Sequence, residues 1–358
     1  MGARDGDNRP ARPPVGRRPS PAQRRVAALL AVAIVTLGLA ACGPHSLRLP
    51  GDGPARTPAP TPTITGTLTP GAAGPFETTG RGPVPPTSGA WFGVYAAPAN
   101  HTAAEKIKAV NTFQTAIGRK VAIVQSFHPW SDVVPSDIDA QIIANGQIDL
   151  LSWAGTDTLS IASGAYDNLI EHTAVAIKNL GAPILLRFRW EMDRPNLAST
   201  VHSPAAYIAA WKHVRAIFTE EGATNAGFVW CPLATGFANG TAQRYYPGDD
   251  QVDWICADVY PPTATTTFAS MMAPVMQFAA KHSRPVIIGE FGIDSASADE
   301  RAQWYDAMSQ DLQAQPQIKA VVYFSSGDLV YTAKDTSKDF SAFRSLAQSR
   351  YLSDVPGP

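Results

Sequence analysis

Several common catalytic motifs are absent from this sequence of 358 residues. It has no Gly-x-Ser-x-Gly nucleophile elbow, no His-Glu-x-x-His zinc motif and no glycine-rich phosphate loop. Its seven histidines show no spacing that suits a metal site. These absences argue against serine hydrolases, zinc peptidases and nucleotide-dependent enzymes. The sequence therefore predicts neither a cofactor nor a metal ion.

Charged residues are also scarce, at 16% of the chain. Seven of the 29 basic residues lie within the first 25 positions, and residues 42–358 carry 22 basic and 28 acidic side chains, a net charge near −6. A nucleic-acid partner requires a basic face. The charge balance therefore argues against nucleic-acid binding.

The first 41 residues are typical of an export signal. An arginine-rich start precedes the uncharged run Val26–Ala41, whose sixteen residues are short for a membrane span, which needs about 20. The junction Leu39-Ala-Ala-Cys42 resembles a bacterial lipobox, which implies a lipid anchor on Cys42 at the outer face of the cell membrane. An ordinary cleaved signal with secretion, or an uncleaved anchor, is the alternative.

Residues 42–88 are rich in proline, threonine and glycine. A segment of this composition buries too little apolar surface to offset the entropy cost of ordering, so we predict a disordered linker. From residue 89 to 354 the pattern changes, and short apolar runs alternate with segments of helical period. There are eight such runs: 91–95, 121–125, 150–153, 184–188, 227–231, 254–257, 286–289 and 320–324.

Eight strand-helix units in this length predict a single (β/α)8 TIM barrel, and a monomer is expected. No Gly-x-Gly-x-x-Gly follows the first run, so a doubly wound sheet is less favoured. Helix signals agree with this reading: Ser203-Pro204 begins a helix that Gly222 ends, and Ser297 with Glu300 forms a capping box.

Two glutamates, Glu191 and Glu290, lie where apolar runs end, and active sites of this barrel gather at the carboxyl ends of its strands. Side chains alternate along a strand. On the fourth strand this predicts an inward face of Leu185, Arg187, Arg189 and Glu191, and an outward face of Ile184, Leu186, Phe188 and Trp190.

Interior arginines need acidic partners, for which Glu191, Asp258 and Glu290 are available. One interpretation is that the glutamates are structural ion-pair partners. The other is glycoside hydrolysis, which uses one carboxylic acid to protonate the leaving oxygen and one carboxylate to attack the anomeric carbon. A cation beside the nucleophile keeps it ionised.

Three segments resemble motifs of family 26 glycoside hydrolases. Arg187-Phe-Arg-Trp-Glu-Met-Asp193 is similar to that family's Arg-Pro-Phe-His-Glu-Met-Asn on strand four. The segment from Tyr246-Pro-Gly-Asp249 to Asp258-Val-Tyr260 resembles the strand-six region, and Ile288-Gly-Glu-Phe-Gly292 the strand-seven motif. The matches occur in order over nearly all of residues 90–350. They imply a retaining (β/α)8 β-glycanase.

The resemblance implies a role for each matched position. Glu191 would be the acid/base and Glu290 the nucleophile, with Tyr260 near Glu290 and Arg187 and Asp258 in the charge network. For Tyr260, capping of the barrel end is the alternative. Trp190 stands where the family has histidine, and Arg194 where glycine is usual. After the eighth run, Phe324-Ser-Ser-Gly-Asp328 lacks the family's tryptophan.

Aromatic side chains pack against sugar faces, which makes Trp130, Trp153 and Trp190 candidates for substrate contact; a place in the core is the alternative for the first two. His128 would either bind sugar or cap its loop. Cys231 and Cys256 lie in two strand-like runs and would form either a disulfide or two buried thiols.

The sequence thus predicts a retaining β-glycanase without a cofactor. β-Mannan is the first candidate substrate, by an endo-1,4-β-mannosidase-like activity, with mixed-linkage β-glucan or β-1,3-xylan next. The expected carboxyl separation is about 5–5.5 Å. The alternative function is a surface lipoprotein that binds carbohydrate without turnover.

Overall fold

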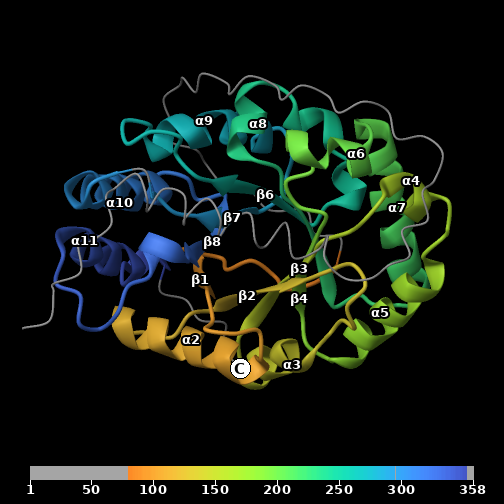
Figure 1. Ribbon diagram of the computed structural model, residues 1–358. Coiled ribbons are helices and arrows are strands. Elements are labelled where there is room, and N and C mark those ends of the chain that lie inside the picture. Colours follow the sequence, from red (N-terminus) through yellow and green to blue (C-terminus); the bar gives the residue numbers. More distant parts are fainter. Residues whose placement is uncertain (1–79, 295, 353–358) are drawn as a thin grey trace, which may run out of the picture. The chain divides into compact units, whose positions relative to one another are not determined.

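The computed structural model describes residues 80–294 and 296–352, and eight parallel strands form a closed barrel in it (Figure 1). The predicted (β/α)8 fold is confirmed. The predicted signal peptide, Cys42 and most of the predicted linker lie outside the described residues. The strands are β1 Trp91–Ala96, β2 Ile123–His128, β3 Ile148–Trp153, β4 Ile184–Phe188, β5 Ala226–Trp230, β6 Trp254–Val259, β7 Val286–Phe291 and β8 Ile318–Ser325.

Helices surround the strands in Figure 1. They are α2 Ala103–Ile117, α3 Asp137–Ala144, α4 Thr158–Ala162, α5 Asp167–Asn179, α6 Ala198–Val201, α7 Pro204–Glu220, α8 Ala234–Ala238, α9 Phe268–Ala279, α10 Ala298–Gln313 and α11 Lys338–Ala347. Within residues 80–294 and 296–352, no helix is both long and apolar enough to cross a membrane.

The predicted helix ends are confirmed by their caps. The Ser203 side chain accepts a hydrogen bond from the Ala206 amide at the start of α7, and Gly222 has a φ of 70° just after its end. Ser297 and Glu300 form the predicted capping box of α10. These local signals fix where the chain leaves each helix and returns to the barrel.

The barrel interior is apolar at the amino ends of its strands. Trp91 and Trp254 are the first residues of β1 and β6, and their rings stack inside the barrel with centroids 5.8 Å apart. This floor closes one end of the barrel. The polar side chains of the interior lie at the opposite end, where the carboxyl ends of the strands meet.

The last part of the predicted linker contacts the barrel. Arg81 donates hydrogen bonds to Thr219 and to the Ala223 carbonyl, and Gly82 donates to the Thr224 carbonyl. Gly82 also lies against Gly227, since an added Cβ would come within 2.4 Å of the Gly227 nitrogen. Arg81 and Gly82, which the sequence assigned to the linker, thus pack against the barrel.

A disulfide joins Cys231 and Cys256, which decides between the two alternatives left open by the sequence. It ties the residue after β5 to the middle of β6. Both sulfurs are buried inside the barrel, directly below Asp258. The bond therefore braces the layer that supports the polar end.

Candidate active site

Three carboxylates converge at the carboxyl end of the barrel. Glu191 follows β4, Asp258 lies in β6 and Glu290 in β7, and one oxygen of each lies within 4.8 Å of the others. The side chains are buried, with Glu191 7% exposed and Glu290 6% exposed. Like charges this close cannot all stay ionised without a cation.

Arg187 supplies that cation. Its side chain is fully buried; Nη1 lies 3.1 Å from both Asp258 oxygens, and Nη2 lies 2.5 Å from Glu290 Oε1. Its Nε donates to Ser152 Oγ at 2.9 Å. Burial favours loss of the charge, but Asp258 and Glu290 more than offset it and raise the pKa of Arg187.

A shift in strand register places Asp258 beside Glu290. The pairing of β6 with β7 is interrupted between Ala257 and Asp258, so that Asp258 pairs directly with Glu290. Gly289 makes this approach possible, since a Cβ there would lie 2.6 Å from Cys256 Sγ and 2.7 Å from Asp258 Oδ1. Burial, and then Glu290, raise the pKa of Asp258 well above its ordinary value.

Glu290 is held through both carboxylate oxygens. Oε1 accepts from Arg187 and from Gln125 Nε2 at 3.3 Å, and Oε2 accepts from the Tyr260 hydroxyl at 2.8 Å. Burial, and then Glu290, raise the pKa of Tyr260 well above its ordinary value, so it stays a neutral donor. Three donors fix the Glu290 carboxylate and stabilise its charge.

Glu191 is held differently. Burial, and then Glu290, raise the pKa of Glu191, although Arg194 acts in the opposite direction. Its Oε2 accepts from Arg194 Nη1 at 2.6 Å, and its backbone nitrogen donates to the Cys231 carbonyl. The two glutamates therefore differ in environment: Glu290 is surrounded by donors from the barrel wall, and Glu191 is paired with one partly exposed arginine.

The predicted alternation along the fourth strand is correct up to Phe188 and wrong for Arg189 and Trp190. Regular β4 ends at Phe188, and Arg189 and Glu191 adopt φ values of 48° and 50°, which are left-handed and break the alternation. Arg189 therefore turns away from the barrel interior and bonds the Ala154 carbonyl and the Thr200 hydroxyl.

Trp190 was predicted to face the helices, and this prediction is also wrong. The guanidinium carbon of Arg187 lies 5.0 Å from the centroid of the Trp190 ring. The centroids of the Trp190 and Phe127 rings are 5.3 Å apart. Trp190 is partly exposed at the barrel mouth beside Arg187. The same change of backbone conformation that removes Arg189 from the interior brings Trp190 into it.

Neither Trp153 nor Trp130 is exposed as a sugar platform. Trp153 is fully buried, and Trp130 stacks on it with ring centroids 4.1 Å apart. Trp153 Nε1 also donates to the Trp130 carbonyl. Both rings belong to the core between the strands and the helices, so their predicted role in substrate binding is wrong.

His128 is likewise part of the structural core. It is 3% exposed, and its Nε2 lies 2.9 Å from Asp139 Oδ1 on α3 and 3.3 Å from Ser126 Oγ. The ring faces the helix layer because it shares the outward face of β2 with Ser126. The prediction that His128 binds sugar is therefore wrong, and the loop-capping alternative agrees better with these contacts.

Five partly exposed aromatic rings surround the carboxylates, and we call them the aromatic crescent. Its members are Tyr95, Phe127, Trp190, Tyr260 and Phe324. Successive centroids lie 5.3 Å apart for Trp190 and Phe127, 5.0 Å for Phe127 and Tyr95, 4.8 Å for Tyr95 and Phe324, and 6.2 Å for Phe324 and Tyr260. The crescent runs from the residue before Glu191 to the residue that bonds Glu290.

Three crescent residues were missed by sequence reasoning, although the sequence carries a signal for them. Tyr95, Phe127 and Phe324 each occupy the second-to-last position of a strand, and Tyr95 pairs with Phe324 in register. Aromatic residues at the same position of several barrel strands form one layer at the mouth. Phe324 of β8 thus brings an aromatic ring to the mouth, although no tryptophan follows β8 in the sequence.

The three carboxylates are close enough to hold a metal ion by distance alone. Arg187, however, already bonds Asp258 and Glu290 and takes the place that a cation would fill. The second group of potential ligands, Cys231, Cys256 and Asp258, contains the disulfide, whose sulfurs are not thiolates. The donor sets of the described residues thus do not favour a metal.

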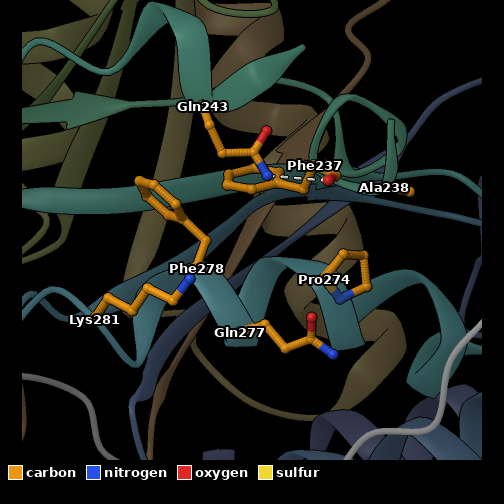
Figure 2. Close-up of a pocket in the computed structure, with 7 residues that line it drawn as sticks. All are labelled: Phe237, Ala238, Gln243, Pro274, Gln277, Phe278 and Lys281. Atoms are coloured by element: carbon orange, nitrogen blue, oxygen red, sulfur yellow. Dashed lines mark hydrogen bonds between the residues drawn. The ribbon is translucent and has the colours of Figure 1, made fainter. Parts of the chain in front are cut away.

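A separate pocket lies on the outer helices (Figure 2). It is lined by Phe237, Ala238, Gln243, Pro274, Gln277, Phe278 and Lys281. Gln243 is already bonded to the Phe237 carbonyl at 3.0 Å. The residues that line this pocket include no carboxylate, unlike those at the barrel mouth.

Known proteins are similar to this chain in sequence, and solved structures are similar to it in fold. No protein-family model matches it. It is 31% identical over 221 residues to endoglucanase H from Acetivibrio thermocellus, covering 55% of this chain and 24% of that protein. It is 26% identical over 205 residues to a β-1,3-xylanase from Vibrio sp., covering 52% and 43%. The chain therefore spans less than half the length of each of these proteins.

Solved structures show the same fold at lower identity. A family 26 β-mannanase from Bacteroides ovatus aligns with a TM-score of 0.55 and 14% identity over 74% of this chain and 89% of that one. A β-mannanase from a symbiotic protist of the termite Reticulitermes speratus, in complex with a gluco-manno-oligosaccharide, gives 0.57 and 15% over 79% and 99%. The predicted resemblance to family 26 glycoside hydrolases is confirmed, since the chain has their fold and matches an endoglucanase and a β-1,3-xylanase in sequence.

Proposed function

We propose that this barrel is a retaining glycoside hydrolase that cleaves a β-linked polysaccharide. The proposal rests on Glu191 and Glu290, which lie in unlike environments and have one carboxylate oxygen each within 4.8 Å of the other. Inverting enzymes need about 6.5–9.5 Å between the two carboxyl groups to admit a water molecule, whereas retaining enzymes need about 5–5.5 Å. Oxygens this close leave little room for a water molecule between the two carboxyl groups, which favours retention.

In the first step of the proposed reaction, a Glu290 carboxylate oxygen attacks the anomeric carbon as the glycosidic C–O bond breaks. Glu191 gives its proton to the leaving oxygen, which departs as a free hydroxyl of the shortened chain. Burial and Glu290 raise the pKa of Glu191, which suits this acid role. Arg187 and Tyr260 hold Glu290 for the attack.

In the second step, Glu191 is a carboxylate and accepts a proton from water. The water oxygen bonds to the anomeric carbon, and the ester bond to Glu290 breaks. Both glutamates thus return to their starting protonation states, and two displacements leave the β configuration unchanged.

The aromatic crescent supports a carbohydrate substrate. Binding sites for small molecules are typically lined by apolar and aromatic side chains, with a few polar groups that fix the orientation of the ligand. Here the aromatic crescent forms the apolar lining around the polar glutamates. A pyranose ring presents C–H groups on its faces and hydroxyls at its edge. We therefore propose β-mannan, mixed-linkage β-glucan and β-1,3-xylan as candidate substrates; similarity to an endoglucanase and a β-1,3-xylanase supports including the last two.

Trp190→Ala should raise KM for the polysaccharide by up to about tenfold, because an aromatic contact contributes about 0.5–1.5 kcal/mol to binding. Trp190→Phe keeps a ring and should recover most of this loss. Trp153→Phe is the matched control: Trp153 is fully buried, so its replacement should lower stability without changing KM. Steady-state kinetics and thermal unfolding of the three variants would show this; equal KM values for Trp190→Ala and the wild type would exclude sugar contact by Trp190.

The function is tested by measuring release of reducing ends from β-mannan, mixed-linkage β-glucan and β-1,3-xylan. We expect release from at least one, with the β-anomer as the first product by NMR. A first product with the α configuration would contradict retention. Binding to one of these glycans with no release after long incubation would instead favour the alternative, a carbohydrate-binding protein without turnover.

A further inference from the structure

Arg194 forms an ion pair with Glu191 that the two displacement steps do not by themselves require. Arg194 Nη1 lies 2.6 Å from Glu191 Oε2, and the two side chains are 31% and 9% exposed. The backbone fixes the pair, since the Arg194 amide donates to the Glu191 carbonyl at 3.0 Å in a turn that begins with the positive φ of Glu191. The sequence departs here from the usual glycine of family 26.

Other charged or titratable groups also face Glu191 from the surrounding elements. They are Arg187 on β4, Asp193 in the same loop as Glu191, Asp258 on β6, Tyr260 after β6 and Glu290 on β7. The Arg187 guanidinium is bonded to Asp258 and Glu290 rather than to Glu191. Arg194 is therefore the cation that directly contacts the Glu191 carboxylate among the residues that the structure describes.

The ion pair has opposite effects on the two proposed steps. The acid step requires protonated Glu191, which burial and the Glu290 charge favour. The base step requires the Glu191 carboxylate, which Arg194 stabilises. Once Glu290 is esterified its charge is gone, so the acidic neighbour no longer opposes ionisation of Glu191 while Arg194 remains in place.

We propose that Arg194 is a positioning residue that holds the Glu191 side chain and stabilises its carboxylate, which favours the base step and confines the acid step to lower pH. This inference rests on the proposed function for its consequence in catalysis. The ion pair itself can be measured without any turnover.

The test is a ¹³C NMR titration of protein labelled at the glutamate carboxyl carbon, with the Glu191 signal assigned by its loss in Glu191→Gln. Aspartates such as Asp193 do not appear in these spectra. An opposite charge in contact lowers a carboxyl pKa, and partial exposure of Arg194 weakens the effect. Arg194→Gln should therefore raise the Glu191 pKa by about one unit. Arg194→Lys keeps the charge and should shift it less.

Arg344→Gln is the matched control, because it removes one exposed positive charge on α11, away from Glu191. It should leave the Glu191 titration unchanged. A Glu191 titration in Arg194→Gln equal to that of the wild type would overturn the inference. If Arg194→Gln fails to fold, Arg194→Met, which also removes the charge, decides: a raised Glu191 pKa supports the pair, and an unchanged one contradicts it.

The catalytic consequence is read from the pH dependence of kcat/KM on whichever of the three glycans is cleaved. Loss of the Glu191 proton limits the alkaline side, so a raised pKa in Arg194→Gln should move that limb to higher pH. If the Glu191 titration shifts but the alkaline limb of the kcat/KM profile does not move, Arg194 has no effect on the acid step. Absence of cleavage of any glycan would contradict the proposed function while leaving the titration result intact.

Discussion

Glu290→Gln should lower kcat on the cleaved polysaccharide by on the order of 10⁴-fold or more, because the glutamine amide cannot form the covalent glycosyl intermediate. Glu191→Gln should lower it by about 10²–10⁴-fold, the usual contribution of a general acid/base. Reducing-end release by purified variants measures both losses. These are the largest effects on turnover that we expect from any single substitution.

The two variants should also differ from each other. An aryl glycoside with an activated leaving group needs little protonation, so Glu191→Gln should retain more of its first-step rate on that substrate than Glu290→Gln does. Glu171→Gln, on the exposed face of α5, is the matched control and should leave kcat unchanged. Near-normal kcat in Glu290→Gln would exclude it as the nucleophile, and equal losses on both substrates would contradict an acid role for Glu191.

Arg187→Met should lower the free energy of unfolding by about 3–5 kcal/mol, because it leaves buried carboxylates without their cation. Arg187 is fully buried and bonds both Asp258 and Glu290, so the loss affects two charges. Chemical denaturation at neutral pH measures the change. Arg187→Met with Asp258→Asn should recover part of the loss, since one uncompensated charge is removed.

The pH dependence of this destabilisation follows from the sign of the shift. Burial and Glu290 already raise the pKa of Asp258, and loss of Arg187 removes a charge that opposes this rise, so the folded state then favours the protonated Asp258 carboxyl still more. The deficit should be largest near neutral pH and shrink as the pH falls through the raised pKa of Asp258. A deficit that grows on acidification would contradict this account.

Arg215→Met provides the control for Arg187→Met. Arg215 on α7 forms a buried ion pair with Asp253, 2.7 Å from Nη1 to Oδ2, and lies outside the carboxylate cluster. Its loss should destabilise the protein similarly while kcat of the folded fraction stays unchanged. Arg187→Met should lose kcat as well, because Glu290 loses a donor to Oε1. Equal kcat in the two variants would show that Arg187 serves stability alone.

Much of the fold could be predicted from local patterns. The eight apolar runs, the capping box of Ser297 and Glu300, and the start of α7 at Pro204 depend on a few neighbouring residues, and the structure confirms them. Small errors occurred at strand ends, such as the start of β2 at Ile123 rather than residue 121. Propensity and hydrophobic period specify an element more firmly than its last residue.

The candidate site was predicted in part. Glu191, Glu290, Asp258, Tyr260 and Arg187 lie together as the motifs implied, but Trp130, Trp153 and His128 do not. Burial of these three depends on which helices cover them, and that is a property of packing rather than of their own segment. Trp130 and Trp153 cover each other, and His128 is engaged by Asp139 of α3.

The sequence by itself determined the number and order of the strands, the helix caps and the inward direction of Arg187, because each follows from residues close together in the chain. Only the tertiary structure decided the rest. Left-handed backbone at Arg189 and Glu191 ended the alternation and exchanged Arg189 for Trp190 at the mouth. Contacts between residues distant in the chain, such as Arg187 with Glu290 and Cys231 with Cys256, form only when the barrel closes, since closure brings the carboxyl ends of all eight strands to one place.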